Sequence, residues 1–236
     1  MNFKNILFVL LLVPVFSSAQ LIEGTGEKVD LSKIKAWLPT NSQEYQSVYH
    51  FGNSELESQF ILIVTPTIIS AQISAGKWER INGNDCWVLN FENLRNVRIE
   101  GNKFYSDETA GEFVTNGSKH GLIIYSPWRS SAQTGEHEIG YPTCPLNKQF
   151  YGKYTYASYR LLETTELQQR KTSELQLIRN EIFARYGYIF KPGSTMDKYF
   201  RKQSWYGGSR SDVSAFLTDI EKWNIELIQR IENDKK

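Results

Sequence analysis

The chain has 236 residues, of which 40% are hydrophobic, 22% are charged and 14% are aromatic. This composition is sufficient to bury a core and excludes wholesale disorder. The 27 basic and 26 acidic side chains leave a formal charge of +1. A charge so close to zero argues against a nucleic-acid-binding protein and against an acidic solvating tail.

Residues 1–19 have the pattern of a secretory signal peptide, in which Lys4 precedes the apolar run 6–16 and small residues follow it. The apolar run is about half of the ~20 residues that a helix needs to cross a bilayer. We therefore expect cleavage after Ala19, a mature chain without a membrane span, and a periplasmic or secreted location. The sequence does not decide between the periplasm and the extracellular space.

The chain contains two cysteines, Cys86 and Cys144. In an oxidising compartment, one disulfide is the simplest use of an even number of cysteines. The alternative is that Cys86, which lies in the strand-like segment 86–89, is a small buried hydrophobic residue. No His stands at ligand spacing from either thiol, so no zinc site is expected.

Residues 59–127 consist of short apolar runs separated by turn residues, the pattern of an antiparallel meander. The turns Asn82-Gly83, Gly101-Asn102 and Asn116-Gly117 tolerate the positive φ that tight hairpins require. Seven strands are expected, over Gln59–Val64, Ile68–Ser74, Cys86–Phe91, Val97–Ile99, Lys103–Tyr105, Gly111–Thr115 and Leu122–Tyr125. Seven short strands bury their aromatic residues only as a small barrel or a sandwich, and the sequence leaves both open.

The hydrophobic period changes to that of a helix in the second half of the chain. Leu175, Ile178 and Ile182 recur on one face, Thr172 or Ser173 precedes them as a candidate N-cap, and Gly187 follows as a candidate C-cap. These positions predict a helix over about residues 172–186.

A second helix is expected over Ser211–Ile231, where apolar residues again form a stripe. The chain therefore has an α+β organisation. We expect an antiparallel β domain with a connector over residues 20–158 and a small helical domain over residues 159–236.

The segment Leu177–Phe190, the pairs Tyr199-Phe200 and Trp205-Tyr206, and the second helix with Glu221, Asn224 and Ile225 resemble the bacterial YARHG domain family. The resemblance covers about Thr172–Glu232. The motif that names the family is read here as residues 183–187, Phe-Ala-Arg-Tyr-Gly, so Phe replaces its first Tyr and Tyr replaces its His. No role that needs an imidazole at that position is carried over.

The resemblance implies an exported bacterial protein that acts at or near the cell envelope, and it implies no catalytic activity. The expected partners are peptidoglycan or another envelope glycan, or an envelope protein. No family is recognised in the residues before the helical part.

Arg179, Asn180 and Arg185 are candidate binding residues, because Arg offers a bidentate fork to a carboxylate or a sugar. Their alternative role is structural, with hydrogen bonds that tie the helix to neighbouring loops, and this role is favoured because buried polar groups usually satisfy backbone. Glu181 and Arg185 are four residues apart in the favourable order for an ion pair.

Trp205 and Tyr206 stand beside two glycines and are candidates for an aromatic platform that binds a glycan. Their alternative role is to fill the space between the helices, which is favoured for Trp205 because large aromatic side chains mostly supply core area. The tyrosines at 151, 154, 156 and 159 offer a second, more exposed candidate binding strip.

No nucleophile elbow, zinc-protease helix, phosphate loop or dinucleotide turn occurs in the sequence, so we expect no cofactor and favour a non-catalytic binding module. Residues 136–138, Glu-His-Glu, are expected in a solvated loop rather than at a metal, because adjacent side chains point to opposite sides. The alternative is an envelope hydrolase whose carboxylates come from the β domain, with Glu79, Asp85 and Glu92 as the available groups.

Overall fold

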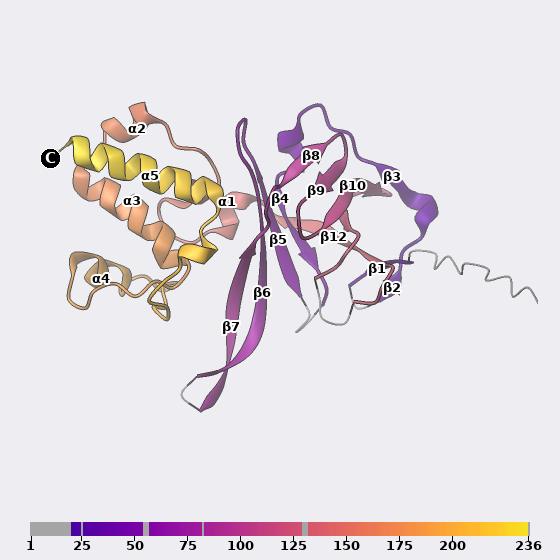
Figure 1. The fold of residues 1–236 in the computed structure, drawn as a ribbon, viewed down its shortest axis with the longest axis horizontal. Helices are drawn as coiled ribbons and strands as arrows, with labels where there is room; N and C mark the ends of the chain where they lie inside the picture. Colours follow the sequence, from indigo (N-terminus) through magenta and orange to yellow (C-terminus); the bar gives the residue numbers. More distant parts are fainter. Residues whose placement is uncertain (1–19, 25, 54–56, 82, 129–131, 236) are drawn as a thin grey trace, which may run out of the picture.

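The computed structural model of the protein describes residues 20–24, 26–53, 57–81, 83–128 and 132–235. The predicted signal peptide and its cleavage site therefore precede the described residues, except for Gln20, the first residue after the expected cut. In the described part, strands occupy the first half and helices the second (Figure 1), which confirms the α+β organisation.

The strands form one sheet with the order β7-β6-β5-β4-β12-β11-β10-β9-β8, and β1, β2 and β3 pair at its side. All ladders are antiparallel except that of β1 with β12. The bounds are β1 (Gln20–Glu23), β2 (Glu27–Lys28), β3 (Ile34–Ala36), β4 (Ser47–Phe51), β5 (Ser58–Val64), β6 (Ile69–Ile81), β7 (Asn84–Asn93), β8 (Arg98–Glu100), β9 (Lys103–Tyr105), β10 (Ala110–Asn116), β11 (Lys119–Ile124) and β12 (Glu136–Cys144).

The sheet folds over on itself at β12, whose first half pairs with β11 and whose second half pairs with β4. The aromatic core between the two halves joins Phe60 of β5 to Phe104 of β9 and Phe113 of β10. Among the described residues no ladder joins the end strands β7 and β8. The arrangement is therefore a folded sheet that encloses a core like a sandwich, and it is not a closed barrel.

All seven predicted strands are present, although β6 and β7 are longer than expected. The prediction of a loop at residues 136–138 is wrong, because these residues begin β12. Glu138 is 2% exposed, and one carboxylate oxygen accepts a hydrogen bond from the backbone N–H of Gly52 at 2.9 Å. A charged side chain is thus buried in a strand because a distant turn supplies its partner.

The helices are α1 (Leu146–Gln149), α2 (Thr164–Gln168), α3 (Thr172–Arg185), α4 (Thr195–Phe200) and α5 (Asp219–Asp234). α3 agrees with the prediction and ends before Gly187, which has a φ of +77°. The second predicted helix begins eight residues late, at Asp219 instead of Ser211. Thr218 and Glu221 form a capping box that starts the helix there, and the short 3₁₀ turn Ser214–Phe216 precedes it.

The predicted disulfide is absent, since Cys86 and Cys144 are both free. Cys144 of β12 pairs with Val48 of β4. From Val48 the paired positions continue across the sheet, strand by strand, to Asn93 of β7. Asn93 is four strand spacings from Cys144, and Cys86 lies seven residues farther along β7. The two cysteines are therefore about 30 Å apart at the ordinary strand spacing and rise. A disulfide needs Cα atoms within about 7 Å.

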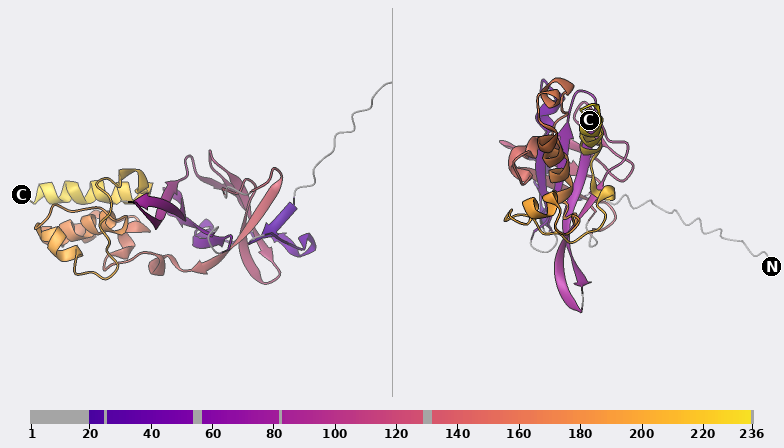
Figure 2. Two further views of the ribbon diagram at one scale, coloured as in Figure 1. Left: turned by 90° about the horizontal axis from the view of Figure 1, so that it is seen from below. Right: turned by 90° about the vertical axis from the view of Figure 1, so that its left-hand side faces the viewer.

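The helical part packs against the outer face of the folded sheet, at one end of an elongated molecule (Figure 2). The apolar contact joins Val48 and Ile61 of the sheet to Leu146 of α1 and Ile220 of α5. β5 is consequently buried on both faces. The division into domains at residues 158 and 159 stays a prediction, and Tyr154 and Ala157 pack in the core of the helical part.

Candidate functional site

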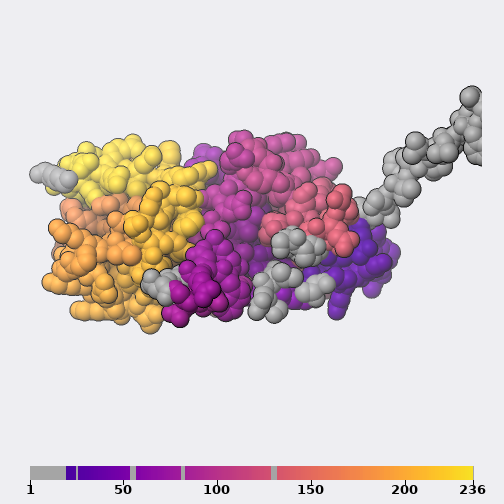
Figure 3. All heavy atoms as spheres, turned by 60° about the horizontal axis from the view of Figure 1, so that its bottom comes forward, coloured from indigo at the N-terminus to yellow at the C-terminus, as the bar shows by residue number. Residues whose placement is uncertain are grey.

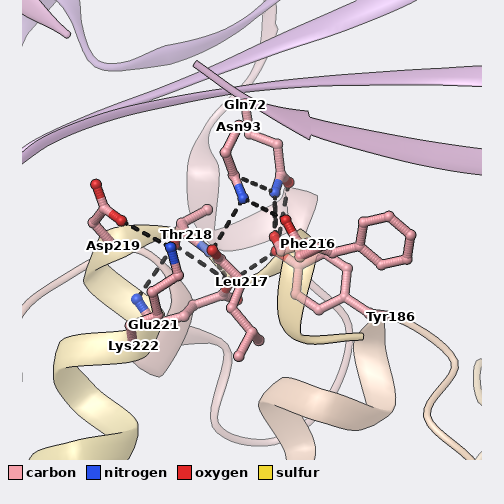
Figure 4. A network of polar contacts seen from close by, with 10 residues as sticks. Gln72, Asn93, Tyr186, Phe216, Leu217, Thr218, Asp219, Glu221 and Lys222 are labelled. Atoms are coloured by element: carbon pink, nitrogen blue, oxygen red, sulfur yellow. Dashed lines mark hydrogen bonds and ion pairs between the residues drawn. The ribbon is translucent and has the colours of Figure 1, made fainter. Parts of the chain in front are cut away.

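A polar network joins the sheet to the helical part beside this apolar contact (Figure 4). The side-chain amide of Gln72 on β6 donates to the carbonyl of Phe216 at 2.7 Å, and the amide of Asn93 on β7 donates to the carbonyl of Leu217 at 3.0 Å. Gln72 is 1% exposed. The signal in the sequence is the Gln in the middle of the predicted strand Ile68–Ser74, because an amide side chain there needs partners when the strand is covered.

Replacing Gln72 with Ala is expected to lower the free energy of unfolding by about 1–3 kcal/mol, because the carbonyl of Phe216 loses its donor in a partly buried contact. The exposed Gln176 on α3 is the matched control, and its replacement with Ala is expected to change stability by less than about 0.5 kcal/mol. Urea denaturation of both variants measures the difference. Equal midpoints would show that the network does not hold the two parts together.

Arg185 and Glu181, four residues apart on α3, form a buried ion pair. Their side chains are 5% and 2% exposed, and an N–O distance of 2.5 Å joins them. Arg185 also donates to the backbone carbonyl of Tyr151 and to the hydroxyl of Ser158, each at 2.7 Å. Burial lowers the pKa of Arg185, although the carboxylates of Glu181 and Glu221 oppose this shift. Its donors therefore hold the connector against α3.

Glu221 is fully buried and connects the same elements from α5. One carboxylate oxygen accepts from the hydroxyl of Ser158 at 2.5 Å, and the other accepts from the hydroxyl of Tyr186 at 2.8 Å and the backbone N–H of Thr218 at 3.0 Å. Burial raises the pKa of Glu221, against the opposing effect of these hydrogen bonds and of Arg185. The carboxylate thus joins the connector, α3 and the start of α5.

A cleft of about 270 Å³ lies at the junction of the sheet and the helical part. Its polar lining includes side chains from both parts: His50, Glu57, Ser58, Gln59, Gln72, Ser74, Lys148, Gln149 and Arg185. Its apolar lining includes Ile61, Leu89, Phe91, Phe150, Tyr151 and Tyr186. Concave sites with mixed lining at the junction of two structural units are common ligand sites. The cleft is therefore the candidate functional site.

The predicted site residues on α3 do not share one site. Arg179 pairs with Glu232 of α5 at 3.1 Å and joins the two helices. The side-chain amide of Asn180 donates to the carbonyl of Gln176 one turn earlier. Of the three predicted polar residues on α3, Arg185 alone lines the cleft.

Trp205 and Tyr206 pack in a small aromatic cluster around Phe200. The Tyr206 hydroxyl donates to the carbonyl of Tyr188 at 2.7 Å, so this side chain is anchored. The expected exposed strip of four tyrosines is wrong, since Tyr154 is buried and the exposed member is Tyr151, at 63%. The ring of Tyr151 stacks toward that of Trp205, with centroids 6.5 Å apart. An aromatic surface therefore begins at the cleft.

Among the described residues, no group of three or more His, Cys, Asp or Glu side chains is placed to hold a metal ion. The cleft has one carboxylate in its described lining, Glu57, which lies 3.8 Å from His50. The carboxylates that the sequence offered for hydrolysis are elsewhere. Glu79 pairs with Lys77 at 2.8 Å, and Asp85 and Glu92 do not line the cleft.

The fold is that of an α+β protein, and its candidate ligand site lies between a folded sheet and a helical part. The family model described as YARHG domain matches residues 152–233, which confirms the resemblance and extends it toward the connector. The Arg of its motif is here Arg185, and Tyr186 stands at the position of the motif's His; both residues line the cleft. No curated protein and no solved structure matches the chain.

YARHG domains occur in extracellular proteins. No helix in the part of the chain that the structure describes is both long and apolar enough to cross a membrane.

Proposed function

We propose that this protein is exported from the cytoplasm and acts as a non-catalytic binding module at the cell envelope, with its ligand in the cleft between the sheet and the helical part. The ligand is an envelope glycan or an envelope protein. The signal-peptide pattern and the YARHG match support the location. The cleft carries the proposal, because side chains from both parts line it.

The lining supports binding rather than hydrolysis. Amide and hydroxyl groups predominate, and they can exchange hydrogen bonds with an uncharged polar ligand. The alternative, an envelope hydrolase that cleaves a glycan, typically uses two carboxylates that flank the bond to be cleaved, whereas the described lining offers Glu57. Binding without cleavage is therefore the function we favour.

Co-sedimentation of the mature protein with purified bacterial sacculi at two salt concentrations, followed by mass analysis of the soluble material, tests the proposal. We expect salt-resistant pelleting without released fragments. Released fragments would assign a hydrolase. No pelleting at either salt concentration would leave an envelope protein as the ligand.

Replacing Tyr151 with Ala is expected to weaken pelleting about tenfold, because one exposed aromatic contact is lost at the cleft. The backbone carbonyl that accepts from Arg185 remains, so the melting temperature should change by less than about two degrees. Trp223 on α5 is an exposed aromatic residue outside the cleft lining and serves as the Ala control. Equal losses in both variants would argue against the cleft.

A further inference from the structure

The hairpin of β6 and β7 extends beyond the rest of the sheet (Figure 1) and carries exposed apolar side chains. Trp78 and Trp87 lie directly opposite one another and are 58% and 42% exposed, and Leu89 is 53% exposed. The two indole rings contact each other with centroids 5.3 Å apart. Exposed apolar groups concentrated at one place mark a binding surface more often than isolated ones do.

These side chains continue the surface of the cleft. Residues two apart on a strand share a face, so Trp87 follows Leu89 and Phe91, which both line the cleft. Phe91 and Trp87 are four positions apart on β7, a length of ~13 Å at the strand rise. In Figure 3 the hairpin lies directly beside the helical part. We define the surface formed by Phe91, Leu89, Trp87 and Trp78 as the hairpin stripe.

The position of Trp87 is set by a glycine on the neighbouring strand. A Cβ atom at Gly76 would lie 2.1 Å from atoms of the Trp87 ring, so the indole occupies space that every other residue would fill. The ring is therefore held over β6 and still has 42% of its surface exposed. A fixed aromatic ring loses little conformational entropy when a ligand stacks on it.

The chemistry of the cleft and the stripe together fits an oligosaccharide. Sugar rings have apolar C–H faces that pack on aromatic rings, and their hydroxyl and acetamido groups exchange hydrogen bonds with amides such as Gln59 and Gln149. A membrane surface fits less well, because the polar residues Asn84 and Asp85 stand at the end of the hairpin, beyond the tryptophans.

We propose that the ligand is an uncharged oligosaccharide, with one end in the cleft and the next sugars stacked along the hairpin stripe on Leu89, Trp87 and Trp78. This inference rests on the proposed function. It adds the chemical class of the ligand and the path along which the ligand lies on the surface. Because the stripe is longer than one sugar ring, the tryptophans contribute to the binding of a long oligosaccharide and not to that of a short one.

Isothermal titration with the tetramer and the dimer of N-acetylglucosamine tests this inference on the mature protein. Replacing Trp87 or Trp78 with Ala is expected to weaken tetramer binding about tenfold and to change dimer binding less than about twofold. Trp87→Phe should retain most of the affinity, and Trp223→Ala should equal the wild type. Gly76→Ala keeps both rings but displaces Trp87, so it should weaken tetramer binding as well.

Several outcomes would overturn the inference while leaving the proposed function intact. One is tetramer binding that is unchanged in both tryptophan variants. Another is no tetramer binding by the wild type while Tyr151-dependent pelleting with sacculi persists. Capture of the wild type but not of Trp87→Ala by phosphatidylglycerol vesicles would assign the stripe to a lipid surface. Loss of pelleting and of titration together would remove the glycan ligand from both proposals.

Discussion

Replacing Arg185 with Met is expected to lower the free energy of unfolding by about 3–5 kcal/mol, because Glu181 would keep a buried carboxylate without its cation. The carbonyl of Tyr151 would lose its donor as well. Urea denaturation with circular dichroism measures the loss. Arg201→Met is the matched control, since Arg201 also pairs with a carboxylate four residues earlier at 2.6 Å but is 64% exposed, and we expect a loss of at most about 1 kcal/mol.

The same variant decides between the two roles of Arg185 that the sequence left open. Its hydrogen bonds to Glu181, Tyr151 and Ser158 favour the structural role. Weakened binding to sacculi together with unchanged stability would instead assign Arg185 to the ligand. Arg185→Lys retains the charge but cannot reach three partners with a planar fork, so an intermediate stability is expected.

Replacing Glu221 with Leu is expected to destabilise the protein by about 3–5 kcal/mol. The hydroxyl of Tyr186 and the backbone N–H of Thr218 lose their acceptor, and the capping box of α5 is lost. Glu226 lies on the exposed face of the same helix, and Glu226→Leu is the control. Thermal unfolding of the two variants should differ by many degrees, and similar melting temperatures would contradict the importance of this network.

The Gln variant of Glu221 reports on the pH dependence. Because burial raises the pKa of Glu221, the folded state holds this proton at a pH at which the unfolded chain, with an ordinary pKa of about 4.3, has released it. The contribution of Glu221 to stability is thus fully present below about pH 4.3 and decreases as the pH rises through the folded-state pKa.

The difference in free energy of unfolding between wild type and Glu221→Gln should therefore decrease from about pH 4 to pH 7. Other carboxylates, such as Glu166, whose pKa is lowered by Arg160, have the opposite dependence and cancel in this difference. Urea titrations at both pH values give the slope. A difference that increases with pH would show that the folded state favours the ionised carboxylate.

Local patterns were sufficient to predict most of the strands and the first long helix. The hairpins and α3 formed where turn residues and apolar periodicity agreed, because both signals act over a few residues. The strand β12 escaped prediction because its glutamates and Pro142 are unusual in a strand. It forms because β11 and β4 supply partners on its two sides.

One part of the sequence contained more information than was used. The continuous apolar run Phe60–Val64 is typical of a strand that is buried on both faces, which implies a second layer over the sheet. Gln72 is buried within the next strand, and its side-chain amide donates a hydrogen bond to that second layer, at the carbonyl of Phe216. Neither feature predicts which element covers the sheet. In the structure it is the helical part, which carries the YARHG match.

The sequence by itself determined the α+β organisation and the resemblance of the C-terminal part, because each depends on residues that are neighbours in the chain. The export signal is a prediction from the same kind of local pattern. Only the tertiary structure decided the site. Ser158 donates to Glu221, which is 63 positions away, and accepts from Arg185, which is 27 positions away. No local period encodes such pairs, since they arise where buried polar groups from separate elements must satisfy one another. These pairs hold the helical part together, and the cleft forms where Gln72 and Asn93 join it to the sheet.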